Sequence, residues 1–260
     1  MATLVNGFSF STITGESSPS KGLIDDTDLT PDEESRIYGG SNADISKYSY
    51  VAKLIPGDAE DVLLCGGTLI APPKNKHKGS PKSERIRAVE IFRHPSFNST
   101  WYTYDVAVIK LEKPSTHKPA RLTGADGSDA KAGTIATVFG WGEISKEKNA
   151  EALQSVAAKI IPDDECSKYA IDTDVTLCAG TERGKGFCGG DFGAPLISKG
   201  VVVGIASTFP GEANDCGELP GMYTRVSHVL DYINDVVNGG STGNVTDSPP
   251  LNEFTAGGSQ

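Results

Sequence analysis

The feature that most constrains this chain is the segment of residues 188–195, which reads CGGDFGAP. Its three glycines let the backbone turn tightly, and Cys188 precedes them as a candidate half-cystine. An acid and a bulky aromatic, Asp191 and Phe192, stand at the centre. A phenyl ring has no lone pair to attack a carbonyl and no proton for a base to remove, so Phe192 cannot serve as a nucleophile. The segment therefore combines a closely turning backbone with an unreactive central residue.

Turn residues and short apolar segments alternate along the rest of the chain. The 260 residues include 30 glycines, and β-branched segments recur between turns while helix-period runs are scarce. This pattern favours an all-β sandwich or barrel. The formal net charge of −10 argues against nucleic acid as a partner. No apolar run reaches the length needed to span a membrane.

The cysteines indicate the compartment. The chain has five of them, which points to two disulfides and one leftover thiol. Disulfides imply an oxidising environment, so we expect a secreted protein. Residues 1–20 lack the basic start and continuous apolar core of a secretory signal. A missing natural N-terminus and unconventional export are the two explanations that reconcile these observations.

Both ends of the chain are polar. Residues 1–36 hold seven acidic and two basic side chains, half of the total net charge, and we expect a disordered, propeptide-like tail. Residues 239–260 are rich in Gly, Ser, Thr and Pro, and we expect a flexible tail. Residues 37–238 form the domain, which closes on a helix capped by Ser227. The apolar face of this helix carries Val229, Leu230, Ile233, Val236 and Val237.

Several segments resemble those of trypsin-like serine proteases. Residues 188–195 resemble the Gly-Asp-Ser-Gly-Gly-Pro nucleophile loop of that family, with Phe192 at the position of the serine. The other segments are 36–40 (RIYGG), 65–70 (CGGTLI), 105–111 (DVAVIKL), 140–142 (GWG) and 220–226 (PGMYTRV). The resemblance covers residues 37–238. It implies an all-β fold of two packed six-stranded antiparallel β-barrels, followed by a C-terminal helix.

The resemblance breaks after residue 70. Family members continue into Thr-Ala-Ala-His-Cys, which supplies the catalytic histidine and the partner of the first cysteine. Residues 71–81 instead read APPKNKHKGSP, and too few residues separate Cys65 from His94 for the usual strands. We therefore expect an incomplete first barrel that is less stable than the second, because lost strands expose a sheet edge.

The catalytic residues that the resemblance implies are mostly missing. Catalysis in this family requires a hydroxyl, an imidazole that takes its proton and an acid that orients the imidazole. Phe192 stands at the hydroxyl position, the histidine segment is absent, and the acid survives as Asp105. Gly190 remains as part of an oxyanion hole, but a hole without a nucleophile completes no acyl transfer. We therefore predict that the chain is not an enzyme.

No other side chain is expected to restore catalysis. His77 lies in a basic, proline-broken loop, and His94 matches a common non-catalytic histidine of the family. His117 in a loop and His228 at the start of the last helix are expected to face solvent. Ser207 matches a family serine beside the triad, and we expect it to be a structural hydroxyl.

The specificity pocket implied by the resemblance is also altered. Gly186 stands at its base, where trypsins place an aspartate that binds Arg or Lys. Phe209 replaces a glycine of one wall, and Gly221 keeps the opposite wall small. Phe187 and Phe192 add bulk nearby. We expect these rings to pack as core in a relaxed former site; an interaction patch is the alternative.

The resemblance assigns an activation junction to Arg36 and Ile37. In the family, cleavage after the basic residue frees an α-amino group, which pairs with the acid before the nucleophile. That acid is Asp191 here, and a buried carboxylate needs a charged partner. A boundary between tail and domain, with an accidental arginine, is the alternative.

The resemblance also implies a disulfide pairing. Cys166–Cys178 and Cys188–Cys216 match the two disulfides of the second barrel. Cys65 loses its partner together with the missing segment. We expect it to be a buried free thiol, with an intermolecular link as the alternative.

The remaining motifs are weaker. Basic side chains gather at residues 74–87, where a solvated loop is expected and an anionic partner is the alternative. The sequons at Asn98 and Asn244 predict N-glycosylation if the chain is secreted. The sequence contains neither a metal-ligand cluster nor a phosphate loop, so we expect no metal and no cofactor.

These observations favour a non-catalytic serine protease homologue that binds another protein. Similar families include cofactor-like homologues of invertebrate immunity and the glucanase inhibitor proteins that oomycete plant pathogens secrete against host endoglucanases. A chain without a clip domain favours the second group, and hence an extracellular hydrolase as the partner. One alternative is a serine endopeptidase with replacement residues. Another is a mis-spliced coding sequence at residues 71–81, although a restored histidine there would leave Phe192 unreactive.

Overall fold

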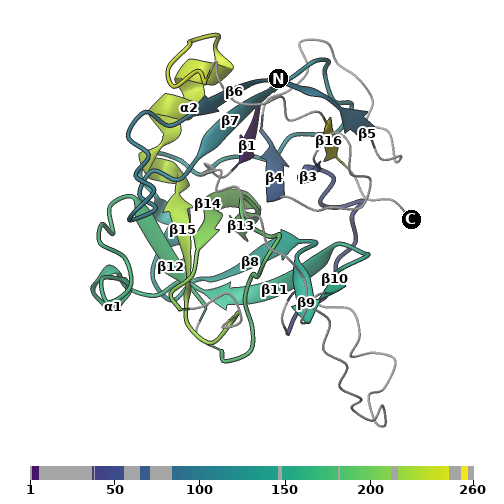
Figure 1. The fold of residues 1–260 in the computed structure, drawn as a ribbon. Helices are drawn as coiled ribbons and strands as arrows, with labels where there is room; N and C mark the ends of the chain where they lie inside the picture. Colours follow the sequence, from purple (N-terminus) through teal and green to yellow (C-terminus); the bar gives the residue numbers. More distant parts are fainter. Residues whose placement is uncertain are drawn as a thin grey trace, which may run out of the picture.

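The computed structural model describes residues 2–5, 37, 39–55, 65–70, 84–145, 148–180, 182–211, 216–245 and 253–256. Over these residues the protein consists mainly of two seven-stranded antiparallel sheets and a short ribbon of β9 (Glu143–Ser145) and β10 (Lys148–Asn149). One sheet lies above the other in Figure 1. The predicted all-β class with a C-terminal helix is confirmed. Each of the two main sheets has seven strands, and the expected pair of six-stranded barrels stays a prediction.

The first sheet is assembled from three distant parts of the chain. Its order is β5 (Glu84–Ile86), β16 (Glu253–Ala256), β3 (Val51–Ile55), β4 (Cys65–Leu69), β1 (Ala2–Val5), β7 (Ala107–Leu111) and β6 (Ala88–Arg93). β1 lies between β4 and β7, where Thr3 is in register with both Leu69 and Ile109. β16 lies between β3 and β5 (Figure 1). Both ends of the chain therefore supply inner strands of this sheet.

Of the disordered and flexible tails that composition predicts for residues 1–36 and 239–260, the structure describes residues 2–5, 239–245 and 253–256. Residues 2–5 and 253–256 are strands, and residues 239–245 pack on β6, where the Arg93 N–H donates to the Gly243 carbonyl at 2.8 Å. The physical reason is that an open ladder carries unpaired N–H and C=O groups, which any extended segment can satisfy. The amino-acid composition of a segment indicates only whether it can bury a core of its own. It does not indicate whether the segment pairs with strands elsewhere in the chain.

The second sheet comes almost entirely from one continuous region. Its order is β12 (Thr176–Ala179), β15 (Gly221–Arg225), β14 (Val201–Thr208), β13 (Pro195–Ser198), β8 (Ile135–Gly140), β11 (Gln154–Lys159) and β2 (Ser41–Asn42). Side chains of β11 alternate between buried and more exposed, as expected for a strand with one face on the core. β14 is buried along nearly its whole length because it lies inside the sheet.

The C-terminal helix α2 (Leu230–Val237) packs beside β6 and β7 (Figure 1). Ile233 and Val236 are buried as predicted, and the Tyr232 hydroxyl donates to the Phe92 carbonyl. Two details of the prediction are wrong. Val237 is 38% exposed, and Ser227 does not cap the helix. A 3-10 turn, η2 (Val226–His228), comes first, so that Val229 takes the cap position without a side-chain hydrogen bond.

Two buried clusters of apolar side chains matter for the site. The first-sheet core includes Ala52, Leu54, Cys65, Leu69, Ile86 and Ile109. The second-sheet core includes Ile37, Val138, Leu177, Phe187, Leu196 and Tyr223. Phe192 contacts both clusters.

Two shorter elements, η1 (Ser128–Ala130) and α1 (Asp163–Cys166), complete the fold. Within the described parts of the chain, every helix is too short or too polar to cross a membrane.

Candidate functional site

Residues 188–195 form a tight loop that leads into β13. Gly190 and Gly193 have φ angles of 83° and 85°, in the left-handed region that residues with a Cβ rarely adopt. The Asp191 N–H donates to the Cys188 carbonyl at 3.0 Å, and the Ala194 N–H donates to the Asp191 carbonyl at 2.9 Å. The disulfide Cys188–Cys216 ties the loop to the segment before β15. The glycines thus set the shape of the loop, and the disulfide holds it.

The Asp191 carboxylate is fully buried at the centre of this loop. It accepts hydrogen bonds from the Gly142 N–H at 2.7 Å and the Cys188 N–H at 3.1 Å. A Cβ on Gly140 would overlap this carboxylate. Burial outweighs the two hydrogen bonds and, with the charge of Glu143, raises the pKa of Asp191 to about 7. The fold therefore holds a carboxyl that would be better stabilised by a cation.

Ile37 is fully buried in the second-sheet core, and its carbonyl accepts a hydrogen bond from the Gly40 N–H. Gly39 turns the chain there with φ 71°. Arg36 lies outside the described residues. Ile37, which follows the predicted junction, is thus packed into the domain, and cleavage after Arg36 stays a prediction.

Phe192 links the two sheets. Its carbonyl accepts a hydrogen bond from the Gly66 N–H of β4 at 2.7 Å. Its ring is half-buried against both the first-sheet and the second-sheet cores. The ring stacks on Phe209, with centroids 6.0 Å apart and planes at 16°, and meets Phe187 edge-on at 6.0 Å. The aromatic side chain therefore contributes packing between the two sheets.

Asp105 and Ser207 lie against each other. Both are buried, and the Ser207 hydroxyl donates to the Asp105 carboxylate at 2.7 Å. The Thr224 hydroxyl donates to the Asp105 carbonyl at 2.7 Å. These bonds join β14 and β15 to the residue just before β7. The arrangement is a buried polar connection between the two sheets.

The described histidines differ in their surroundings. His77 lies outside the described residues. His94 stacks on Tyr104 at 4.6 Å and meets Tyr232 at 4.7 Å, and burial together with the charge of His228 lowers its pKa. His228 is exposed. His117 is only 4% exposed, so its predicted contact with solvent is wrong; its segment packs inward, where the Ala120 N–H donates to the Leu69 carbonyl.

The residues assigned to the specificity pocket surround a group of aromatic rings. Phe187 is 2% exposed and meets Tyr223 edge-on at 5.2 Å and Phe209 at 5.8 Å. A Cβ on Gly221 would overlap the Phe187 ring, and a Cβ on Gly186 would lie 3.1 Å from the Gly217 Cα. The space beside Gly221 is therefore filled by the protein's own side chain. The sequence signalled bulk at this position, whereas the contact of Phe187 with Tyr223 of β15 is set by the fold.

The cysteines divide between the two halves of the molecule. Cys166 is joined to Cys178, and Cys188 to Cys216, while Cys65 in β4 is a buried free thiol. Burial, together with the charges of Asp105 and Asp191, raises the pKa of Cys65 well above its usual range. Burial thus disfavours the thiolate, which is the reactive form of cysteine.

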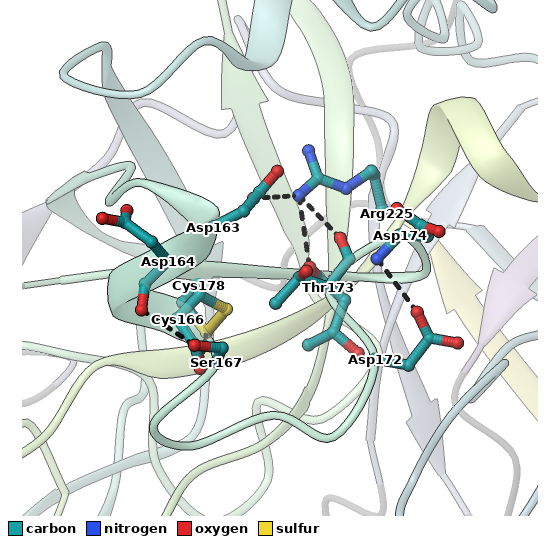
Figure 2. The surroundings of a disulfide bond; sticks show 10 residues. Asp163, Asp164, Cys166, Ser167, Asp172, Thr173, Asp174, Cys178 and Arg225 are labelled. Atoms are coloured by element: carbon teal, nitrogen blue, oxygen red, sulfur yellow. Dashed lines mark hydrogen bonds and ion pairs between the residues drawn. A yellow bond between two sulfur atoms is a disulfide. The ribbon is translucent and has the colours of Figure 1, made fainter.

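Figure 2 shows the surroundings of the Cys166–Cys178 disulfide. Arg225, at the end of β15, donates from Nη2 to the Asp163 carboxylate at 2.6 Å and to the Thr173 carbonyl at 3.0 Å. Arg225 thus holds the loop between Cys166 and Cys178, which the disulfide closes. Its role in this structure is to support the fold.

Among the residues described, no group of three or more His, Cys, Asp or Glu side chains is arranged to hold a metal ion. The basic stretch at 74–87 lies mostly outside these residues. Within it, Arg87 pairs with Glu112 at 2.8 Å on the surface.

Comparisons with known proteins agree with this geometry. The Trypsin family model matches residues 37–233. The chain belongs to the trypsin family.

Its relatives include Glucanase inhibitor protein 3 of Phytophthora infestans, which is 34% identical over 244 residues that span 81% of this chain and 92% of the relative. Glucanase inhibitor protein 2 of the same organism is 33% identical over 78% of this chain and 90% of the relative. A trypsin of Saccharopolyspora erythraea is 30% identical over 79% of this chain and all of the relative. The predicted resemblance to the trypsin family and to glucanase inhibitor proteins is thus confirmed.

A solved structure supports the same fold. Neuropsin, a serine protease of mouse brain, superposes with a TM-score of 0.66 at 23% identity, over 76% of this chain and 98% of neuropsin. At that identity, the similarity extends to the trypsin-like fold alone.

Proposed function

We propose that this protein is a catalytically inactive member of the trypsin family that binds and inhibits an extracellular glucanase. The observation that carries the proposal is Phe192, whose ring packs between the two sheets at the position of the family nucleophile. A side chain that supplies packing there supplies no lone pair for attack on a carbonyl. Loss of the hydroxyl leaves the fold available as a binding scaffold.

The partner is inferred from the relatives. Proteins named as glucanase inhibitors match this chain over about nine-tenths of their own length. The two disulfides fit an oxidising, extracellular environment. A secreted inhibitor that meets its target outside the cell accounts for both observations.

The other residues of the former site are assigned to the scaffold. Asp105 and Ser207 connect the sheets through their hydrogen bond, Gly190 permits the loop turn, and Gly186, Phe209 and Gly221 border the filled pocket. We further assign Arg36 as the cleavage site that releases the Ile37 amino group to neutralise Asp191. The pairing of this amino group with Asp191 would stabilise the loop, since no catalysis depends on the cleavage.

The test combines an activity assay with an inhibition assay. The Arg36-cleaved protein is incubated with broad peptide libraries and a fluorophosphonate probe, and separately with a panel of extracellular endo-β-glucanases. We expect neither peptide turnover nor probe labelling, and inhibition of at least one glucanase. Phe192→Ser is the matched control. It restores a hydroxyl but no histidine segment, so it should stay unlabelled and should still inhibit.

The competing function is a serine endopeptidase with replacement residues. Labelling or peptide turnover that a single substitution abolishes would establish it. Failure to inhibit any glucanase would refute the inhibitor role while leaving the absence of catalysis intact.

A further inference from the structure

We propose that the loop between β6 and β7 enters the sugar-binding cleft of the glucanase, with Trp101 as its anchor and Arg93 as a cation for the cleft carboxylates. This inference rests on the proposed function and names the surface that carries it out. The surface, here called the aromatic loop, consists of Arg93, Phe97, Trp101 and Tyr102. Along the chain it comes shortly before Asp105.

The aromatic loop exposes two large rings at adjacent positions. Trp101 is 57% exposed and Tyr102 is 44% exposed. Leaving such area in water forgoes the stabilisation that burial would give. Trp and Tyr are also the residues most enriched among those that dominate binding energy in protein interfaces. Other exposed apolar residues, such as Ile135 and Ile171, occur singly.

The backbone holds this loop in one shape. The Asn98 N–H donates to the Thr103 carbonyl at 3.1 Å, which closes the loop as a short antiparallel bridge. The Asn98 side-chain oxygen accepts from the N–H groups of Thr100 and Trp101 at 2.9 and 3.1 Å. Tyr102 has a φ angle of 53°, which is uncommon for a residue with a side chain. A loop already ordered in this way avoids much of the entropy cost of binding.

The base of the loop is fixed to the body of the protein. Tyr104 also has a positive φ, 54°, and its ring stacks on His94 at 4.6 Å. His94 in turn contacts Tyr232 of α2. The inner side of the loop is thus packed, and the exposed rings of Trp101 and Tyr102 are left for a partner.

A cation and a hollow lie at the start of the same loop. The exposed Arg93 guanidinium sits 5.6 Å from the centre of the Phe97 ring. Both residues, together with Gly243 and Asn244, line a hollow of about 290 Å³. This volume is enough for a protruding side chain of the partner. On a protein with a net charge of −10, such a cation gives a local site for an anionic group.

A glycosidase cleft fits these features. Most glycosidases place two carboxylates on either side of the bond that they cleave, and these match the charge of Arg93. Sugar rings present flat C–H faces that pack on aromatic rings, so a cleft shaped for a sugar also accepts the flat indole of Trp101. We therefore commit to the substrate cleft of the glucanase as the occupant of this surface.

The test measures the Kd and the mode of inhibition with a glucanase that the wild-type protein inhibits. Because Asn98 lies within the aromatic loop and Asn244 lines its hollow, the protein is produced without N-glycans. Trp101→Ala should weaken binding by about 30-fold, and Arg93→Gln by about 10-fold. Ile171→Ala removes an equally exposed side chain (62%) elsewhere and should change Kd by less than twofold. Thermal unfolding should be the same for all four proteins.

Two further measurements locate the surface in the cleft. A β-glucan oligosaccharide should compete with the wild-type protein for the glucanase. Replacing a catalytic carboxylate of the glucanase with the amide should abolish most of the difference between Arg93 and Arg93→Gln, as a double-mutant cycle would record.

The outcomes separate this inference from the proposed function. If the wild-type protein inhibits the glucanase and Trp101→Ala inhibits equally well, the aromatic loop is not the contact surface, and the inhibitor role stands. Inhibition that the oligosaccharide does not relieve would exclude the cleft. Absence of binding to every glucanase would overturn both proposals.

Discussion

The two sheets of this protein take their strands from differently distributed parts of the chain. The second sheet draws nearly all its strands from residues 135–225, and that region carries both disulfides and the 188–195 loop. The first sheet combines residues 51–111 with four residues from each end of the chain, and its cysteine is unpaired. A continuous region with covalent links brings its own strands together. The first sheet instead takes two of its inner strands from the ends of the chain.

The largest expected effect comes from removing a recruited strand. Deleting residues 251–260 takes β16 from between β3 and β5, and we expect the free energy of unfolding to fall by on the order of 5 kcal/mol. The reason is that two strands lose their ladder partner at once. Hydrogen exchange should show lost protection in β3 and β5 while β13 and β14 stay protected.

Deletion of residues 257–260 alone is the matched control, because it retains β16. If the longer deletion exposes β13 and β14 as much as β3, the two sheets unfold as one unit and the contrast between them disappears.

The second prediction concerns the buried acid of the 188–195 loop. Asp191 has its pKa raised to about 7 in the folded protein, against about 4 in an unfolded chain. The folded state therefore holds the proton more tightly. The stability that this group contributes is fully present below pH 4 and is lost as the pH rises to 7, by about 4 kcal/mol in total.

Urea denaturation between pH 5 and pH 7 should show this loss in the wild-type protein and not in Asp191→Asn. In the Arg36-cleaved protein the slope should also vanish, because an ammonium group beside Asp191 keeps it ionised. An identical slope in wild type and Asp191→Asn would assign the pH dependence to other groups.

The third prediction compares the cysteines of the two sheets. Replacing Cys188 and Cys216 with Ala opens a loop of sequence separation 28 and should cost about 3.5 kcal/mol through the added entropy of the unfolded chain. Cys65→Ala in the first sheet removes one buried sulfur and should cost about 1 kcal/mol. Denaturation under non-reducing conditions measures both. A larger cost for Cys65 would mean that the first sheet, despite its recruited strands, is the more tightly packed.

Much of the second sheet could be predicted from local pattern. The alternation of β11 and the buried run of β14 are properties of their own residues, because the side chains of a strand point alternately to its two faces. The segment with Asp191 and Phe192 was recognisable because its glycines and acid are close together in sequence. The burial of His117 had no such signal, since it depends on contacts between its segment and β4.

The sequence by itself determined the all-β class, the C-terminal helix, the unreactive centre of the 188–195 loop and the imbalance of cysteines. Only the tertiary structure decided that Phe192 packs on both sheets, that Phe187 fills the space beside Gly221, and that residues 2–5 and 253–256 become inner strands. The physical reason is that residue chemistry and periodicity are local. The partner of a backbone hydrogen bond or of an aromatic ring is chosen by whichever distant segment the fold brings beside it.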